Sequence, residues 1–344
     1  MQLSLTDRRH VGSTALSLPP FGFGGGALGE LYAKIDEEQS RGALATAWDS
    51  GIRFYDTAAW YGRGLSEVRV GGFLRPKPRS DYLLTTKVGR TLHRPRDPAH
   101  FDRSPWAGGL NFEVKFDYSR DGILHSYGQA LQRLGIDTVD ALIIHDLDAD
   151  YLGDKLPGHQ RQLESSGFAA LQELKSAGDI KAIGMGVNST EAFNEVALRV
   201  DVDFLIVAMP YTLLDQSSLT TGMARCLERG IGVIIGAPFS SGILATGSGS
   251  KATYGYVSAP AAIQDKVKRI EAVCRAHGVA LPAAALQFPP AHPAVVSIIP
   301  GVISGEQVRQ NIASVGAPIP AGFWSDLKSQ ALIDPDSPTP KDAK

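Results

Sequence analysis

Short apolar segments alternate along this chain with amphipathic segments. The apolar segments are rich in β-branched residues, which is typical of strands, whereas the amphipathic segments have the spacing of helices. Runs such as DALIIH and GVIIG lack polar alternation, which indicates strands covered on both faces, as in a parallel sheet. We expect eight strands, at 19–25, 52–57, 82–88, 139–145, 180–187, 203–209, 231–237 and 295–300.

The helical segments between these strands carry recognisable end signals. Gly51, Gly135 and Gly278 follow helical patterns, at positions where a left-handed C-cap needs a residue without Cβ. Alternating strands and helices predict an α/β protein, and eight repeats predict a closed (β/α)8 TIM barrel that forms one domain over residues 1–332. The expected helices include EEQSRGALATAWDSG, DGILHSYGQALQRLG, FAALQELKSAGD, IQDKVKRIEAVCRAHG and GEQVRQNIAS.

Two segments depart from this repeat. The stretch 89–118 has no period and contains Pro, Gly, His and Trp, so we expect a long loop after the third strand. Such a loop lies on the face where barrel enzymes carry their active sites, where it would serve as a lid. Residues 333–344 are polar and rich in Pro, and we expect them to form a flexible tail.

Composition narrows the range of partners. Of the 344 residues, 43% are hydrophobic and 20% charged, and the net charge of −2 comes without runs of Lys or Arg. This disfavours nucleic acid and membrane surfaces and favours a small-molecule substrate. The absence of a signal-like or membrane-spanning apolar run predicts a cytoplasmic protein. Cys226 and Cys274 lie in helical patterns, so we expect buried, unpaired thiols and no metal site. The charge balance indicates no particular oligomeric state.

Candidate chemistry lies at the ends of three consecutive predicted strands. IRFYD ends at Asp56, YLLTTK at Lys87 and DALIIH at His145. Barrel enzymes place their reacting groups at the carboxyl ends of the strands, so these side chains should share one mouth. Tyr61 follows five residues after Asp56, and its hydroxyl would face the same mouth.

Together these four groups suit proton and hydride transfer. A lysine cation about 4 Å from a phenol contributes about 4 kcal/mol at an effective dielectric of 20, enough to lower the phenol pKa by up to about 3. Asp56 would keep Lys87 charged, and His145 would orient the substrate oxygen or relay its proton. We therefore expect Tyr61 to act as acid and base while hydride moves between a nicotinamide cofactor and a carbonyl or hemiacetal carbon.

These residues also stand in a recognisable order. RFYDTAAWYG, LLTTKVG and DALIIHD resemble the aldo-keto reductases over about residues 10–320. More narrowly, GLSEVRVGGFL and AALQFPPAHPAVVSIIPG resemble the branch of L-fucose (D-threo-aldose 1-) dehydrogenases and pyridoxal 4-dehydrogenase. The resemblance implies catalytic roles for the same four residues. It also implies NAD-linked oxidation of a cyclic hemiacetal to a lactone, where the hemiacetal is either an aldose such as L-fucose or pyridoxal.

The resemblance also implies a set of cofactor contacts. Its NADP-dependent members bind the 2′-phosphate through a Lys-Ser pair and an Arg, but here Gly301, Val302 and Gln307 take those places. Losing these cations removes charge-assisted bonds, so we expect NAD to be preferred, with NADP as the alternative if Arg309 compensates. The implied contacts are Gly25, Gly26 and Asp56 at the nicotinamide, Asn188 and Ser189 at its carboxamide, Pro238, Phe239, Ser241, Gly242 and Leu244 at the pyrophosphate, and Gly301, Gln307, Gln310 and Asn311 at the adenosine. A plain turn at 238–244 and a polar helix surface at the last two residues are the structural alternatives.

The substrate pocket and the reaction class leave alternatives open. Trp60, His93 and Trp106 are the candidate substrate residues, and aromatic walls suit a sugar ring or a pyridine equally. A general NADP-linked carbonyl reductase is one alternative. A barrel aldolase with Lys87 as Schiff-base nucleophile is another, which Asp56 disfavours by keeping the lysine protonated. A third is a barrel that binds the dinucleotide without turnover.

Overall fold

The computed structural model describes residues 7–249 and 251–340, and its centre is a sheet of eight parallel strands. All eight predicted strands are present, although several are shorter than their apolar segments. They are hydrogen-bonded in chain order, from first to last. The strands are β3 (Phe23–Gly24), β4 (Phe54–Asp56), β5 (Leu83–Val88), β8 (Ala141–Ile144), β9 (Ala182–Val187), β10 (Phe204–Val207), β11 (Gly232–Ile235) and β14 (Val295–Ile298).

Backbone bridges join the first strand to the last. Phe21 pairs with Ile298 and Gly24 with Gly301, both in parallel, and the amide of Gly22 donates to the carbonyl of Ile298 at 2.9 Å. A side chain at Gly24 is excluded, because its Cβ would lie 2.4 Å from the Ile299 carbonyl oxygen. These bridges close the sheet into the (β/α)8 barrel that the alternation of elements predicted.

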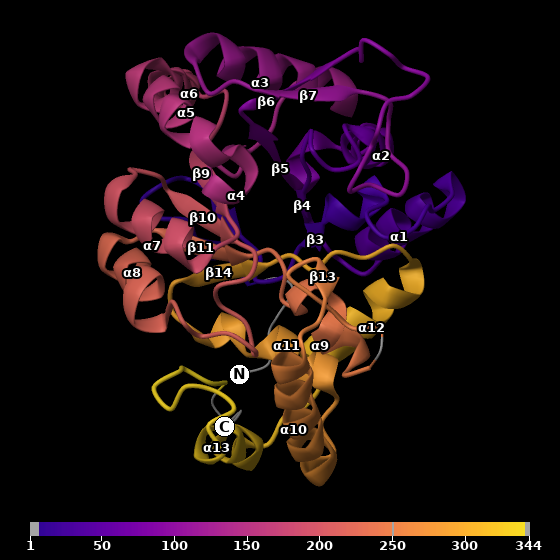
Figure 1. The fold of residues 1–344 in the computed structure, drawn as a ribbon, viewed down its shortest axis with the longest axis vertical. Helices are drawn as coiled ribbons and strands as arrows, with labels where there is room; N and C mark the ends of the chain where they lie inside the picture. Colours follow the sequence, from indigo (N-terminus) through magenta and orange to yellow (C-terminus); the bar gives the residue numbers. More distant parts are fainter. Residues whose placement is uncertain (1–6, 250, 341–344) are drawn as a thin grey trace.

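Helices surround the barrel strands, as Figure 1 shows. The expected caps are present: Gly135 and Gly278 are left-handed at the ends of α3 and α10. Ser304 accepts from the amide of Gln307 at the start of α12. The helices are α1 (Glu37–Asp49), α2 (Leu65–Leu74), α3 (Arg120–Leu134), α4 (Ala149–Leu152), α5 (Leu156–Gln162), α6 (Phe168–Ala177), α7 (Thr190–Arg199), α8 (Ala224–Arg229), α9 (Ile243–Thr246), α10 (Ala261–His277), α11 (Leu281–Gln287), α12 (Gly305–Gly316) and α13 (Ala321–Ser329).

Barrel strands other than β3 contribute to two apolar layers. In β10, Phe204 and Ile206 point into the barrel, whereas Leu205 and Val207 pack in the larger layer under the helices. Alternate residues are therefore buried on opposite faces, which explains why runs such as DALIIH and GVIIG lack polar alternation. Cys226 and Cys274 are buried and unpaired, as expected.

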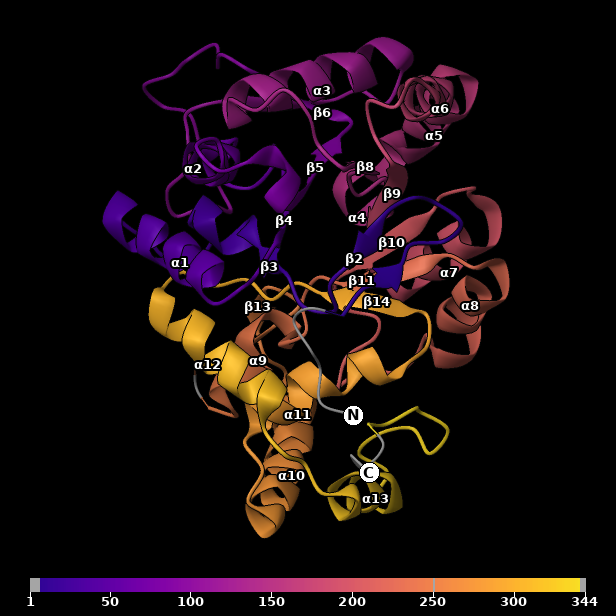
Figure 2. The same ribbon diagram turned by 180° about the vertical axis from the view of Figure 1, so that it is seen from behind.

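A hairpin near the start of the chain covers the barrel end where the strands begin. It consists of β1 (Arg9–His10) and β2 (Ser17–Leu18), paired antiparallel, and is seen from behind in Figure 2. Val11 and Leu16 of this hairpin join the apolar layer inside the barrel. This end is therefore plugged, which leaves the carboxyl ends of the strands as the accessible mouth.

The segment 89–118 is more ordered than we expected. It contains two antiparallel strands, β6 (Arg90–His93) and β7 (Glu113–Phe116). The tip between them is held down because the amide of Ala107 donates to the carbonyl of Glu30, and the amide of Leu110 to the carbonyl of Gly62. Strands of four residues carry too little periodicity to stand out in a polar stretch.

The end of the chain also differs from our expectation of a flexible tail over 333–344. Ile333 and Ser337 are buried, and the amide of Asp334 donates to the Gln216 side chain at 3.2 Å. Residues 333–340 therefore pack on the barrel despite their polarity, and 341–344 lie outside the described residues. In the part of the chain that the structure describes, no helix is long and apolar enough to cross a membrane.

Candidate active site

A buried ion pair lies at the mouth of the barrel. The Lys87 ammonium contacts a carboxylate oxygen of Asp56 at 2.6 Å, and both side chains are 2% exposed. Thr85 donates to the other carboxylate oxygen at 2.8 Å, and Lys87 also donates to the Thr57 carbonyl at 3.0 Å. Burial is the largest influence on Asp56 and raises its pKa, against the attraction of Lys87. The pair is therefore held in place by its surroundings.

Tyr61 lies over this pair and against His145. Its ring centroid is 4.7 Å from the Lys87 nitrogen and 5.9 Å from the centre of the His145 ring, which meets it edge-on at 85°. The turn after β4 brings the tyrosine back over the mouth, with Gly62 and Gly64 in left-handed conformations. The structure thus brings together Tyr61 and the three residues predicted at the strand ends.

The pKa of Tyr61 shifts in the direction opposite to our expectation. Burial, followed by the negative charges of Asp56 and Asp146, raises the pKa of Tyr61 well above its ordinary value. The expectation rested on the cation of Lys87 alone. In the structure that cation is paired with Asp56, and its ring contact with Tyr61 does not outweigh the two carboxylates.

Two charged residues at this mouth were not among those predicted from the sequence. Asp146 directly follows His145 and adopts a positive φ of 37°, and Arg90 follows Lys87 by three residues. The carboxylate of Asp146 contacts the Arg90 guanidinium at 3.0 Å and the Nε2 atom of His145 at 3.2 Å. A charged residue directly after a strand-end histidine was the signal available in the sequence.

Aromatic residues cover the site. Trp106, from the tip of the long segment, meets Trp60 at 5.7 Å between ring centroids and Tyr61 at 6.2 Å. His93 does not join them: it contacts Thr91 and meets His125 of α3 at 6.2 Å, and no contact with Tyr61 occurs among the described residues. His93 points to the helix because successive residues of β6 alternate between its two faces. Trp60 and Trp106 alone of the three candidate substrate residues line the mouth.

The residues expected around the nicotinamide lie close to this centre. A Cβ on Gly26 would come within 3.8 Å of the Tyr61 ring, so this glycine leaves that side of the ring open. Gly25 is more constrained, since its Cβ would meet the Asp56 carbonyl at 2.7 Å. Asn188 donates to Asp146 at 2.9 Å, whereas Ser189 caps α7 through the amide of Ala192.

The loop 238–244, which we expect at the pyrophosphate, contains three successive residues with positive φ. Phe239 has φ −92° and ψ 9°, and Ser240, Ser241 and Gly242 follow with φ of 49°, 65° and 121°. The amides of Ser240 and Gly242 donate to the carbonyls of Ala237 and Phe239, each at 2.9 Å. Pro238 precedes this turn. The side chain of Leu244 is fully buried, and its amide also donates to the Phe239 carbonyl, at 3.1 Å.

The expected adenosine end lies where α12 begins. Gln307 takes part in the helix cap, since its side chain accepts from the amide of Ile303 at 2.9 Å. Gln310 donates to Glu306 at 3.0 Å, and Asn311 is buried. Gly301 lies beside Ala27, and a Cβ added to this glycine would be 3.5 Å from the Cβ of Ala27. The side chains at this end are therefore the amides of Gln307, Gln310 and Asn311 and the carboxylate of Glu306.

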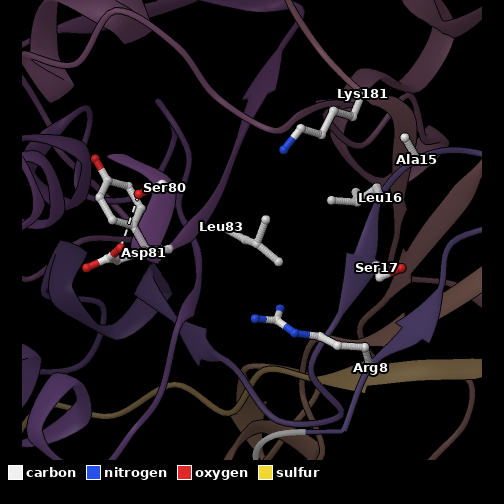
Figure 3. A pocket seen from close by; sticks show the side chains of 9 residues that line it. Arg8, Ala15, Leu16, Ser17, Ser80, Asp81, Leu83 and Lys181 are labelled. Atoms are coloured by element: carbon white, nitrogen blue, oxygen red, sulfur yellow. Dashed lines mark hydrogen bonds between the residues drawn. The ribbon is translucent and has the colours of Figure 1, made fainter. Parts of the chain in front are cut away.

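A cavity of about 220 Å³ occurs at the opposite end of the barrel (Figure 3). Arg8, Ser17, Asp81, Leu83 and Lys181 are among the residues that line it, at the starts of β5 and β9. None of the four candidate catalytic residues reaches it. The site is therefore defined by its side chains at the mouth.

Known proteins with similar sequences point to one family. The model of the aldo/keto reductase family matches residues 20–331. Pyridoxal 4-dehydrogenase of Microbacterium luteolum is 38% identical, covering 97% of this chain and 100% of the relative. D-threo-aldose 1-dehydrogenase of a Pseudomonas species is 36% identical, covering 95% and 97%.

Solved structures agree with this match. The holo form of the aldo-keto reductase AKR11C1 from Bacillus halodurans aligns with a TM-score of 0.71 and 25% identity, over 95% of this chain and 96% of that one. The family match spans nearly the whole barrel, including the four candidate catalytic residues. The chain belongs to the aldo/keto reductase family of oxidoreductases.

Proposed function

We propose that this protein is an NAD-dependent dehydrogenase that oxidises a cyclic hemiacetal to a lactone. The observation that carries the proposal is the cluster of Tyr61, Lys87, Asp56 and His145 at the open end of the barrel. The two relatives described above, named for pyridoxal and D-threo-aldose, support a hemiacetal substrate. Trp60 and Trp106 offer apolar faces to a flat or ring-shaped molecule.

The residues at the mouth divide the work of the reaction. A bound oxidised nicotinamide would accept hydride from the carbon that carries the hydroxyl, and its positive charge would favour the Tyr61 phenolate. Tyr61 takes the hydroxyl proton as the carbonyl of the lactone forms. Lys87, held by Asp56, keeps a cation over the phenol ring of Tyr61. His145, which meets the Tyr61 ring edge-on, would position the substrate oxygen.

The proposal is tested by following NADH formation at 340 nm. L-Fucose, L-galactose, D-arabinose and pyridoxal are offered with NAD or NADP, and at least one should be oxidised with NAD. Tyr61→Phe should abolish that signal, and full activity in this variant would refute the tyrosine mechanism. Lys87 is a poor Schiff-base nucleophile because its ammonium is buried against Asp56 at 2.6 Å, so borohydride should trap no adduct.

The preference for NAD rests on the charges at the start of α12. Gly301, Val302 and Gln307 place no cation there, and Glu306 places a carboxylate in the first turn. A dianionic 2′-phosphate would meet the like charge of Glu306, and Arg309 is the one cation of α12 that could offset it. We expect kcat/KM to be higher with NAD than with NADP, and Glu306→Gln to narrow the difference. Exposed Glu38 of α1 is a control, since Glu38→Gln should leave the ratio unchanged.

A further inference from the structure

The connection between β6 and β7 brings Trp106 to the mouth of the barrel. Residues 94–112, all of which the structure describes, form no helix or strand. Trp106 is nevertheless 6% exposed, and its ring lies 6.2 Å from that of Tyr61 and 5.7 Å from that of Trp60, between centroids. Long connections without secondary structure are usually either mobile or functional. Contacts from outside this segment must therefore hold the tryptophan in place.

Glu30 holds the middle of the tip, which we define as residues 101–112. Its carbonyl oxygen accepts from the amide of Ala107 at 2.8 Å, and its Oε2 atom accepts from the amide of Gly109 at 3.2 Å. Gly108, between these two, has no room for a side chain, because an added Cβ would collide with the same carboxylate oxygen. The tip is therefore fitted closely to one residue of the segment that follows β3.

The carboxylate of Glu30 is itself fixed to the barrel. Its other oxygen, Oε1, contacts the Arg69 guanidinium of α2 at 2.9 Å, and the two side chains are 9% and 4% exposed. Arg69 also donates to the carbonyls of Leu28 and Ile35, at 2.8 Å and 3.0 Å. Hydrogen bonds between ionised groups are stronger than those between neutral ones. Glu30 thus joins the tip to a well-anchored part of the molecule.

Arg63 holds the two ends of the tip. Its Nη1 atom donates to the carbonyl of Phe112 at 3.0 Å, and its Nη2 atom donates to the carbonyl of Ser104 at 3.2 Å. The guanidinium also lies 4.9 Å from the centre of the Phe101 ring and 5.3 Å from that of Trp60. One side chain therefore links both ends of the tip to the turn after β4.

Glu30 and Arg63 share an unusual backbone conformation. Their φ angles are 66° and 54°, in the left-handed region that residues with side chains seldom occupy. Such conformations persist where the surrounding structure requires them, and they are common at functional sites. The two residues follow neighbouring strands, β3 and β4, at the carboxyl end of the barrel. The strain is therefore located where the tip meets the mouth.

We infer that Glu30 and Arg63 are positioning residues that attach the tip to the barrel, so that Trp106 lies against Tyr61 before any ligand binds. The inference rests on the proposed function, because it states how the same site binds its substrate. A wall that is already in place lowers the entropy lost on binding and so strengthens it without new contacts. The two attachments should therefore act on KM through Trp106 and change kcat less.

The first experiment follows amide hydrogen exchange of the tip by mass spectrometry, without cofactor or substrate. Glu30→Gln keeps the size of the side chain, but its single carboxamide oxygen can accept from Arg69 or from Gly109, and its NH2 group then faces the other donor. Exchange in residues 101–112 should become about tenfold faster or more, which corresponds to the loss of one hydrogen bond to a charged group.

Glu37→Gln is the matched control. Glu37 pairs with the same Arg69 at 2.6 Å, but it makes no contact with the tip among the described residues, so exchange there should keep the wild-type rate. Unchanged exchange in Glu30→Gln, or equal acceleration in Glu37→Gln, would overturn the inference. If Glu30→Gln does not fold, Gly108→Ala tests the same contact from the side of the tip, because the new Cβ displaces the Glu30 carboxylate. Exchange at the wild-type rate in that variant would contradict the inference as well.

The second experiment measures KM and kcat in the wild-type and Trp106→Ala backgrounds. Glu30→Gln/Arg63→Met removes both attachments, so a smaller fraction of molecules holds Trp106 in place, and KM rises by the inverse of that fraction. KM should approach that of Trp106→Ala, up to about tenfold above the wild type. In the Trp106→Ala background the same two changes should have little further effect on KM.

An equal rise of KM in both backgrounds would indicate a purely structural role and contradict the inference. The exchange measurement needs no turnover, so it separates failure of the inference from failure of the proposed function. If the wild type oxidises none of the four substrates while tip exchange changes as expected, the proposed function is wrong and the attachment of the tip is confirmed.

Discussion

The ion pair of Asp56 and Lys87 allows a quantitative test of how the mouth is held together. At 2.6 Å, and with an effective dielectric of 20, two unit charges attract each other by about 6 kcal/mol. Burial offsets much of this, as the raised pKa of Asp56 indicates. The pair is thus of small net benefit, but either charge left alone would be costly.

We therefore expect a strongly non-additive double-mutant cycle. Lys87→Met leaves the Asp56 carboxylate buried without a cation, and Asp56→Asn leaves the Lys87 ammonium without an anion. Each should lower the free energy of unfolding by about 3–5 kcal/mol. The double variant removes both charges, so its cost should be similar to one single variant, with a coupling energy of about 3 kcal/mol.

Urea unfolding of the four proteins, followed by circular dichroism at pH 7, measures this cycle. Arg120 and Glu173 supply a matched control, because they form a two-bond ion pair at 2.7 Å on the surface, with side chains 46% and 60% exposed. Water screens such a pair, so its cycle should be additive within error. If the effects of the buried substitutions also add, the proposed electrostatic origin is refuted.

Three further perturbations have expected outcomes. Gly72→Ala should stabilise the protein by about 0.5–1 kcal/mol, because nothing lies within 4 Å of the new Cβ. Gly71→Ala should destabilise it, because the new Cβ would lie 2.0 Å from the Leu134 carbonyl oxygen. Urea unfolding measures both variants, and the opposite order of stability would contradict this packing. Trp106→Ala should raise KM up to about tenfold, because the substrate loses an aromatic wall. An unchanged KM would show that Trp106 does not contact the substrate. Burial lowers the pKa of His292 to about 4, below its unfolded value of about 6.5. Between these two pH values the unfolded chain binds more protons than the folded protein, so the free energy of unfolding falls as the pH drops through this window. His292→Gln should reduce this acid sensitivity by at most about 3 kcal/mol, measured as the change in unfolding free energy between pH 7 and pH 4.

Much of the barrel was determined by local patterns in the sequence. Eight apolar segments became the eight barrel strands, because a parallel strand is covered on both faces and is therefore largely apolar. The strand ends also placed Asp56, Lys87 and His145 at one mouth, since parallel strands finish on the same side. These inferences needed only residue order and the geometry of one repeated unit.

Only the tertiary structure decided how those side chains interact. The pKa of Tyr61 rises because burial and two carboxylates act on it together, and the partner of His145 is Asp146, which a left-handed backbone turns toward it. Ile333 is buried at the end of a polar stretch because distant segments provide its contacts. Desolvation and charge interactions depend on distances between residues far apart in the chain, and such distances are set when the barrel closes.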